Sequence, residues 1–174
     1  MAGVIWANAE GDEYQAVELP YDGRELSMVI LLPRAGQFEA FEGSIDAQVV
    51  DAILKGLESR QVALTLPEFE FESYFHLKEI LAAMGMPVAF SGEADFSGMT
   101  GNRELFIAEV IHKAFISVDE AGTEAAAATA VVMKEIAAPL EPIEVTIDHP
   151  FIFLIRDIET GTILFVGRIV NPSA

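Results

Sequence analysis

The sequence predicts an α+β fold in which strands outnumber helices. Short apolar runs rich in Val, Ile and Phe recur along the 174-residue chain, and such runs are typical of strands. Helical spacing of apolar residues is confined mainly to the region between residues 38 and 84. These helical segments do not alternate with strands as regular βαβ crossovers do. We therefore expect mixed sheets with few helices.

The first predicted elements are a hairpin and two short helices. Residues 17–21 and 26–32 form the two strands, and Asp22-Gly23 between them is a strong hairpin turn signal. Apolar residues then repeat at helical spacing over residues 38–57. Ser44 is expected to cap the second of the two helices.

The middle of the chain alternates between strand, helix and loop signals. Residues 62–72 alternate apolar and acidic side chains, as one half-buried strand would. Residues 76–84 form a short amphipathic helix that Gly85 stops. Residues 90–101 are rich in Gly, Ser and Asp and are expected to be a loop. A long apolar strand is predicted over residues 106–118.

Three further strands are predicted near the C-terminus. Residues 141–145 begin the first of them, after a proline-containing stretch. Residues 151–155 and 163–169 form the other two, joined by a turn at residues 159–161. The sequence contains no internal repeat and no linker.

Composition narrows the range of partners. The formal net charge of −18 disfavours nucleic acids and anionic membranes as partners. There is no Cys, so disulfides and thiolate chemistry are excluded. No apolar run is long enough to span a bilayer, and the first ten residues do not resemble a signal peptide.

The residues give no support to an enzyme, a metal or a cofactor. The three histidines, His76, His112 and His149, are not spaced as zinc ligands. No glycine-rich phosphate loop and no Gly-x-Ser-x-Gly elbow occur. A lone histidine inside a predicted strand, such as His112, is more often structural than catalytic. We expect no catalytic residues, no metal ligands and no cofactor.

Residues 119–136 permit two interpretations. Read locally, their run of Ala residues predicts a helix, which would make the protein a small α+β binding module with a helix at residues 123–134. The strongly strand-forming residues before them favour a segment that changes state. Small side chains do not clash when a chain slides between packed strands, and Thr129, Val131 and Val132 suit an inserted strand.

The same segment resembles a known family. Residues 120–130, Glu-Ala-Gly-Thr-Glu-Ala-Ala-Ala-Ala-Thr-Ala, are similar to the reactive-loop hinge of the serpins, the serine protease inhibitor superfamily. Residues 107–115 are similar to the serpin strand that feeds this loop. Other serpin-like blocks follow the family order, and they lie at residues 94–99, 145–155 and 165–172.

The resemblance implies that residues 1–174 are the C-terminal portion of a single serpin domain, with the reactive loop at about residues 120–142. Serpins are roughly twice this length, so we expect a chain that lacks the N-terminal half of the serpin fold. Such a fragment or truncated product is expected to inhibit poorly alone. Its exposed strand edges would favour self-association.

The implied function is inhibition of a serine protease that attacks the loop as a suicide substrate and is trapped when the cut loop inserts into a sheet. Glu120 begins the hinge, Gly122 gives it conformational freedom, and Thr123 is the first side chain to enter the sheet. The small residues that follow, Ala125, Ala126, Ala127 and Ala128, favour an inhibitory serpin. A non-inhibitory binding or structural serpin, or an inactive fragment, is the alternative.

The reactive bond follows from the spacing that is usual in serpins. Counted from the hinge glutamate, that spacing reaches Ile136-Ala137, and neighbouring bonds over residues 133–138 stay open. An aliphatic residue at the cut suits elastase-like or subtilisin-like proteases. Cleavage after Lys134 would suit trypsin-like proteases instead.

The resemblance also implies structural roles and one departure from the pattern. His112 is expected to hydrogen-bond a neighbouring strand, and Pro150 and Phe151 belong to the C-terminal signature. Glu68 stands where many serpins carry a basic residue, so it cannot pair with Glu120 as that residue would. The family leads us to expect an extracellular protein, although the sequence itself leaves the location unknown.

Overall fold

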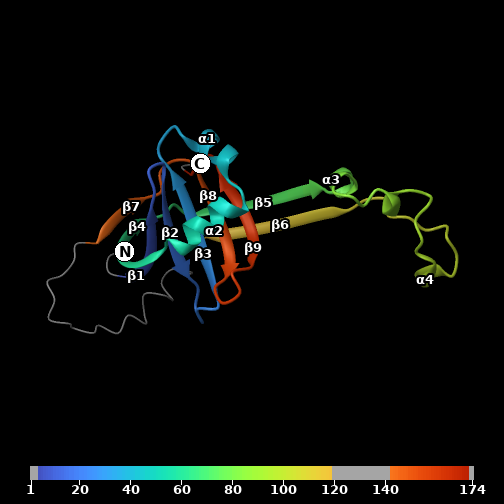
Figure 1. Cartoon of the computed structure of the whole chain (residues 1–174), viewed down its shortest axis with the longest axis horizontal. Coiled ribbons are helices and arrows are strands. Elements are labelled where there is room, and N and C mark those ends of the chain that lie inside the picture. The colour runs from blue at the N-terminus through green and yellow to red at the C-terminus, as the bar shows by residue number, and fades with distance from the viewer. Residues whose placement is uncertain (1–3, 119–141, 173–174) are drawn as a thin grey trace. The chain divides into compact units, whose positions relative to one another are not determined.

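The described residues form a main sheet of seven strands. The computed structural model describes residues 4–118 and 142–172. The strand order is β7-β4-β1-β2-β3-β8-β9, and all neighbours are antiparallel except β4 and β7 (Figure 1). The strands are β1 (Val4–Glu10), β2 (Tyr14–Pro20), β3 (Leu26–Pro33), β4 (Glu58–Thr65), β7 (Ile143–Thr146), β8 (Phe151–Asp157) and β9 (Ile163–Ile169).

The β2–β3 hairpin confirms the predicted turn. Gly23 has a φ of +86°, a conformation that glycine adopts without strain. Its N–H donates to Asp22 Oδ1 at 3.0 Å, and Tyr21 N–H donates to the Leu26 carbonyl at 2.9 Å. The hairpin places β3 between β2 and β8, which explains why every residue of β3 after Leu26 is buried.

Two helices cover one face of the main sheet. They are α1 (Phe38–Ser44) and α2 (Ala47–Lys55), which lie within the predicted residues 38–57. Phe41, Val50 and Ile53 of these helices pack on the sheet and form the core. Burial of such side chains is the main stabilising contribution. The sheet contributes Ala9, Ala16, Val29, Leu31, Ile152 and Leu154 to this core.

Residues 69–118 form a second compact unit. Its antiparallel hairpin consists of β5 (Phe69–His76) and β6 (Ile111–Val118). Between these strands lie α3 (Lys78–Ala83), the 3₁₀ helix η1 (Val88–Phe90) and α4 (Ser97–Thr100). Along the first part of β5 the Glu residues are exposed and Phe69 and Phe71 are half-buried, as the alternating pattern predicts. The α+β class is confirmed.

The prediction of a single strand over residues 62–72 is wrong. The structure ends β4 at Thr65 and begins β5 at Phe69, and the two strands belong to different sheets. Pro67 lies in the break. Proline has no N–H to donate to a sheet ladder, so an uninterrupted central strand is not available there.

The long strand predicted over residues 106–118 is also shorter than expected, because β6 begins at Ile111. Its partner β5 ends at His76, where the chain turns into α3. Residues 106–110 therefore have no strand opposite them, although Ile107 N–H donates to the Ala89 carbonyl at 2.9 Å. An apolar run becomes a strand only where a partner strand exists.

Three smaller features differ from the sequence-based predictions. Asp46, and not Ser44, caps α2, since Asp46 Oδ1 accepts from the backbone N–H groups of Gln48 and Val49, each at 2.8 Å. The Ser44 hydroxyl instead donates to the Phe41 carbonyl at 2.8 Å. The predicted loop at residues 90–101 contains α4, and the residue pattern did not predict β1.

Candidate functional site

The site predicted from the sequence begins where β6 ends and finishes where β7 begins. The hinge and the predicted reactive bond both lie in residues 119–141, outside the described residues. The structure therefore describes the two strands that flank the site. The predicted residues that fall outside are Glu120, Gly122, Thr123, Ala125, Ala126, Ala127, Ala128, Ile136 and Ala137.

The upstream strand β6 has one edge that no described residue pairs with. It is bonded to β5 from the pair Ile111–His76 to the pair Val118–Phe69, and within residues 4–118 and 142–172 it has no other strand partner. An open edge offers backbone N–H and C=O groups to a further strand. Phe115 of β6 is 60% exposed, so apolar surface accompanies this edge.

The structure places His112 within β6. Its ring stacks on that of Phe75, its ladder partner in β5, with ring centroids 6.3 Å apart and an angle of 25° between the planes. The hydrogen bond to a neighbouring strand that the resemblance implies is not made with any residue in the described ranges. The structural role of His112 stays a prediction.

Downstream of the segment, His149 links the entrance of β8 to the end of β3. Its Nε2 lies 2.7 Å from the Pro33 carbonyl oxygen, which can only accept, so Nε2–H donates this hydrogen bond across the sheet. Its Nδ1 lies 2.6 Å from Asp148 Oδ1. This hydrogen bond with His149 holds the pKa of Asp148 below its ordinary value.

Pro150 and Phe151 lie directly after this link. Phe151 opens β8 and its side chain is fully buried. Pro150 precedes it and is partly buried. The structural roles that the resemblance implies for these two residues stay predictions.

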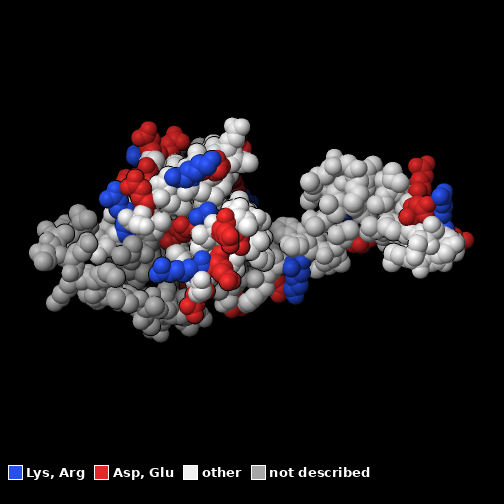
Figure 2. Space-filling view, turned by 60° about the horizontal axis from the view of Figure 1, so that its bottom comes forward, with Lys and Arg blue, Asp and Glu red and all other residues white. Residues whose placement is uncertain are grey.

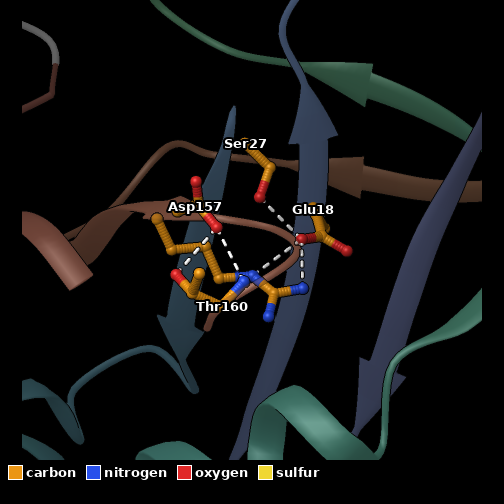
Figure 3. A network of polar contacts seen from close by, with 5 residues as sticks. Glu18, Ser27, Asp157 and Thr160 are labelled. Carbon is orange, nitrogen blue, oxygen red and sulfur yellow. Dashed lines mark hydrogen bonds and ion pairs between the residues drawn. The ribbon is translucent and has the colours of Figure 1, made fainter. Parts of the chain in front are cut away.

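A buried polar cluster joins three strands of the main sheet. Glu18 of β2 accepts at Oε1 from Ser27 Oγ of β3 at 2.7 Å, and from Arg156 Nε and Nη2 of β8 at 2.9 and 2.6 Å (Figure 3). The Arg156 and Glu18 side chains are only 14% and 11% exposed. Charged groups buried to this extent are costly unless they are paired and hydrogen-bonded, as these are.

Sequence reasoning missed this cluster, although a signal was available. Glu18 stands between the apolar Val17 and Leu19, and Arg156 directly follows the apolar run of residues 151–155, where a buried charge needs a partner. Next to the cluster, Asp157 accepts from the Thr160 N–H at 2.7 Å and from its hydroxyl at 2.8 Å (Figure 3). The bond from the Thr160 backbone N–H is the largest cause of a lowered pKa for Asp157.

An open hollow of about 590 Å³ lies between the helices and the C-terminal strands of the main sheet. Apolar side chains such as Val50, Leu154 and Val166 line it. At its rim Arg168 Nη1 donates to both carboxylate oxygens of Glu42, at 2.7 and 2.9 Å. The adjacent strand β9 pairs only with β8 in the described part of the chain, and Val166 is 68% exposed.

The described residues offer no ready metal or membrane site. Within them no group of three or more His, Cys, Asp or Glu side chains is arranged to hold a metal ion. None of the helices in the described ranges has the length and apolar character needed to cross a bilayer. On the face shown in Figure 2, basic side chains are scattered among acidic ones, which gives no support to a nucleic-acid partner.

Comparison with known proteins assigns the family. The family model described as Serpin (serine protease inhibitor) matches residues 2–172. An uncharacterized serpin-like protein of Thermococcus kodakarensis is 50% identical over 166 residues, covering 94% of this chain and 38% of that protein. Human neuroserpin is 39% identical over 167 residues, covering 95% and 40%. Intracellular coagulation inhibitor 2 of Tachypleus tridentatus is 42% identical over 156 residues, covering 89% and 38%.

The solved structures agree with this assignment. Uncleaved ovalbumin superposes with a TM-score of 0.81 at 28% identity, covering 99% of this chain and 43% of that one. The chain therefore belongs to the serpin family of serine protease inhibitors, and the resemblance seen in the sequence is confirmed. The chain spans about two fifths of the length of the curated relatives that it matches. That this chain has the activity of a whole serpin is therefore a proposal.

Proposed function

We propose that this chain supplies the reactive loop of a suicide-substrate inhibitor of serine proteases. A target protease would attack the segment at residues 120–142 and form an acyl-enzyme. The cut segment would then insert as a strand beside β6 and carry the protease with it. Inserting roughly a dozen residues at about 1 kcal/mol per net hydrogen bond would release on the order of 10 kcal/mol. A release of that size compares with the stability of a whole domain.

The open edge of β6 is the observation that carries this proposal. β6 ends at Val118, directly before the proposed hinge, and its ladder with β5 leaves the opposite edge without a partner among the described residues. Serpin loop insertion is one of the standard cases of a strand added to a sheet edge. A loop that begins at the end of β6 needs only to fold back at Gly122 to lie along that edge.

The proposed reactive bond is Ile136-Ala137, with the bonds over residues 133–138 as neighbours. An aliphatic residue before the bond fits elastase-like or subtilisin-like targets, and Lys134 would fit a trypsin-like one. No residue of this chain is proposed to be catalytic. The family consists mostly of inhibitors, and the attacking serine belongs to the target.

Two further expectations belong with this proposal. The open edges of β6 and β9 would let copies of the chain pair with one another, which sedimentation at rising concentration would detect as growing mass. The family also suggests an extracellular protein. One relative is named an intracellular coagulation inhibitor, so the location stays a prediction.

The test is incubation of the chain with elastase-like, subtilisin-like and trypsin-like proteases, alone and joined to the N-terminal half of a serpin. A complex that survives denaturing electrophoresis would support suicide inhibition, and the mass of the released peptide would identify the reactive bond. Cleavage of both forms without such a complex would contradict inhibition. That result would favour the non-inhibitory or inactive-fragment alternative.

A hinge variant gives the matched control. Thr123→Arg places a charge where the hinge must enter a sheet, so we expect normal cleavage and a large loss of complex. Thr123→Ser keeps a small hydroxyl and should retain the complex. An equal yield of complex from both variants would contradict insertion through this hinge.

A further inference from the structure

A cut in the proposed loop would leave part of the main sheet without a covalent link to the rest. The peptide after the cut, residues 137–174, carries β7, β8 and β9. We propose that Glu18, Ser27 and Arg156 keep this peptide on the sheet by fixing the register in which β8 pairs with β3. The proposal rests on the proposed cut, but the cluster itself lies entirely in the described residues.

The contacts that would hold the peptide are unequal. β7 pairs with β4 at the outer edge of the sheet, over Ile143–Thr146. β8 pairs with β3 in the interior, where its first four residues are at most 6% exposed. The β3–β8 pairing is therefore the main attachment, and β9 is attached through β8.

Apolar packing alone does not define how β8 lies along β3. The first five residues of β8 are Phe-Ile-Phe-Leu-Ile, and β3 contains Met-Val-Ile-Leu-Leu. Register is normally specified because a slip exposes apolar groups or buries polar ones. A slip of two residues keeps each side chain on its own face and places apolar residues opposite apolar residues along most of the pairing. A specific register therefore needs polar groups.

The cluster penalises a slip of two residues in one direction, and Asp157 penalises a slip in the other. In the observed register Arg156 lies opposite Ser27 and Leu154 lies opposite Val29. A slip in the first direction places Arg156 opposite the exposed Glu25, which precedes β3, whereas Glu18 lies opposite Val29 in the interior of β3. Glu18 is 8% exposed, so its carboxylate would be left buried without a cation.

A slip the other way drives charge into the core. Arg156 would then lie opposite Val29, which is also the partner of Glu18, so this slip does not separate Arg156 from Glu18. Asp157, however, would lie opposite Met28, which is 4% exposed. The carboxylate of Asp157 would also leave the turn in which it binds Thr160. Each slip therefore leaves one carboxylate buried without its partner, Glu18 in the first and Asp157 in the second, while the observed register provides partners for both.

The chain offers a matched comparison in another ion pair between the peptide and the rest, Arg168 with Glu42. Arg168 of β9 binds Glu42 of α1, but these side chains are 60% and 36% exposed. An exposed pair contributes little, whereas removing one partner of a buried pair leaves an uncompensated charge. Only the buried pair is expected to control retention.

The first experiment measures retention of the peptide after cleavage. The full chain is cut with a subtilisin-like protease, the protease is stopped with a small covalent inhibitor, and the rate at which residues 137–174 leave is followed by gel filtration and mass. Glu18→Gln and Arg156→Gln are each expected to speed the loss about a hundredfold or more. Glu42→Gln and Arg168→Gln should change it less than about fivefold. Equal rates in the two sets would overturn the proposal.

The second experiment reads the register and needs no cleavage. Because the chain has no Cys, two introduced cysteines report one pairing without background. Met28→Cys with Ile155→Cys joins the observed partners, and Leu26→Cys with Ile155→Cys joins partners one slip away. In the parent only the first pair should form a disulfide.

The decisive test introduces the same two cysteine pairs into the double variant Glu18→Leu with Arg156→Met. This variant replaces the ion pair by apolar groups and should fold. There we expect both cysteine pairs to form disulfides, because the register is no longer unique. A single register in this background would overturn the proposal. Absence of a covalent protease complex would overturn the proposed inhibition instead, and it would not affect either measurement here.

Discussion

Gly167 lies opposite Phe153 in the β8–β9 ladder, and the Phe153 ring fills the space where a side chain at position 167 would begin. A Cβ there would overlap the ring atoms Cζ and Cε1. Glycine in a strand often marks such a close approach. The absence of a side chain at position 167 therefore allows β8 and β9 to pair in the observed register.

We expect Gly167→Ala to lower the free energy of unfolding by roughly 1–3 kcal/mol, since the buried ring must move to admit a methyl group. Urea unfolding would measure the change. Gly43→Ala is the control, because a Cβ at this α1 position meets nothing within 4 Å. The control should be neutral or stabilising by up to about 1 kcal/mol. A Gly167→Ala protein as stable as the parent would show that the ring yields freely.

Ile53→Ala should destabilise the main sheet and its helices by about 2–5 kcal/mol. Ile53 is 2% exposed in α2 and packs in the core, so the change removes buried methyl groups and leaves a cavity. The control is Asp51→Ala on the same helix, which removes the exposed ion pair between Asp51 and Lys55. We expect this control to cost less than about 1 kcal/mol. Equal losses in the two variants would contradict the assigned packing of α2.

Asp46→Ala should cost about 1 kcal/mol of stability, because two N–H groups at the start of α2 lose their acceptor. Asp46→Asn should restore most of it, since asparagine is a comparable cap. Ser44→Ala removes only one hydrogen bond to the Phe41 carbonyl and should cost less. Thermal unfolding of the three variants would decide the order. A larger loss of stability from Ser44→Ala than from Asp46→Ala would contradict Asp46 as the cap of α2 and would favour Ser44, as the sequence predicted.

Acid should weaken the attachment of β8 through Asp148. The hydrogen bond with His149 lowers the pKa of Asp148 in the folded protein, so the folded state favours the ionised carboxylate. Its contribution to stability is present above the unfolded pKa, about 3.9, and is lost as the pH falls through the lower folded value. Urea unfolding between about pH 2 and 6 would measure the fall in the free energy of unfolding with acid. Asp148→Asn should remove part of that fall.

An exposed carboxylate provides the comparison for this pH dependence. Asp12→Asn makes the same change of charge in the exposed turn between β1 and β2. If Asp12→Asn changed the fall in stability at low pH as much as Asp148→Asn does, the hydrogen bond between Asp148 and His149 would not be the cause of that fall.

Local signals in the sequence were enough for several elements and for the family. The Asp22-Gly23 pair predicted the β2–β3 turn because few other residues adopt the φ of +86° found at Gly23. The helical spacing over residues 38–57 predicted two helices on the core. The ordered serpin-like blocks predicted the family that the comparisons show. The hinge and reactive-bond residues stay predictions, since they fall outside the described ranges.

By itself, then, the sequence determined the class of fold, the position of its turns and the family, since each depends on residues close together in the chain. The tertiary structure decided where strands end and which charges meet. β6 starts at Ile111 because its partner ends at His76, and Glu18 finds Arg156 because β2, β3 and β8 lie side by side. These contacts join residues far apart in the chain, and their energy comes from burial that no local pattern encodes.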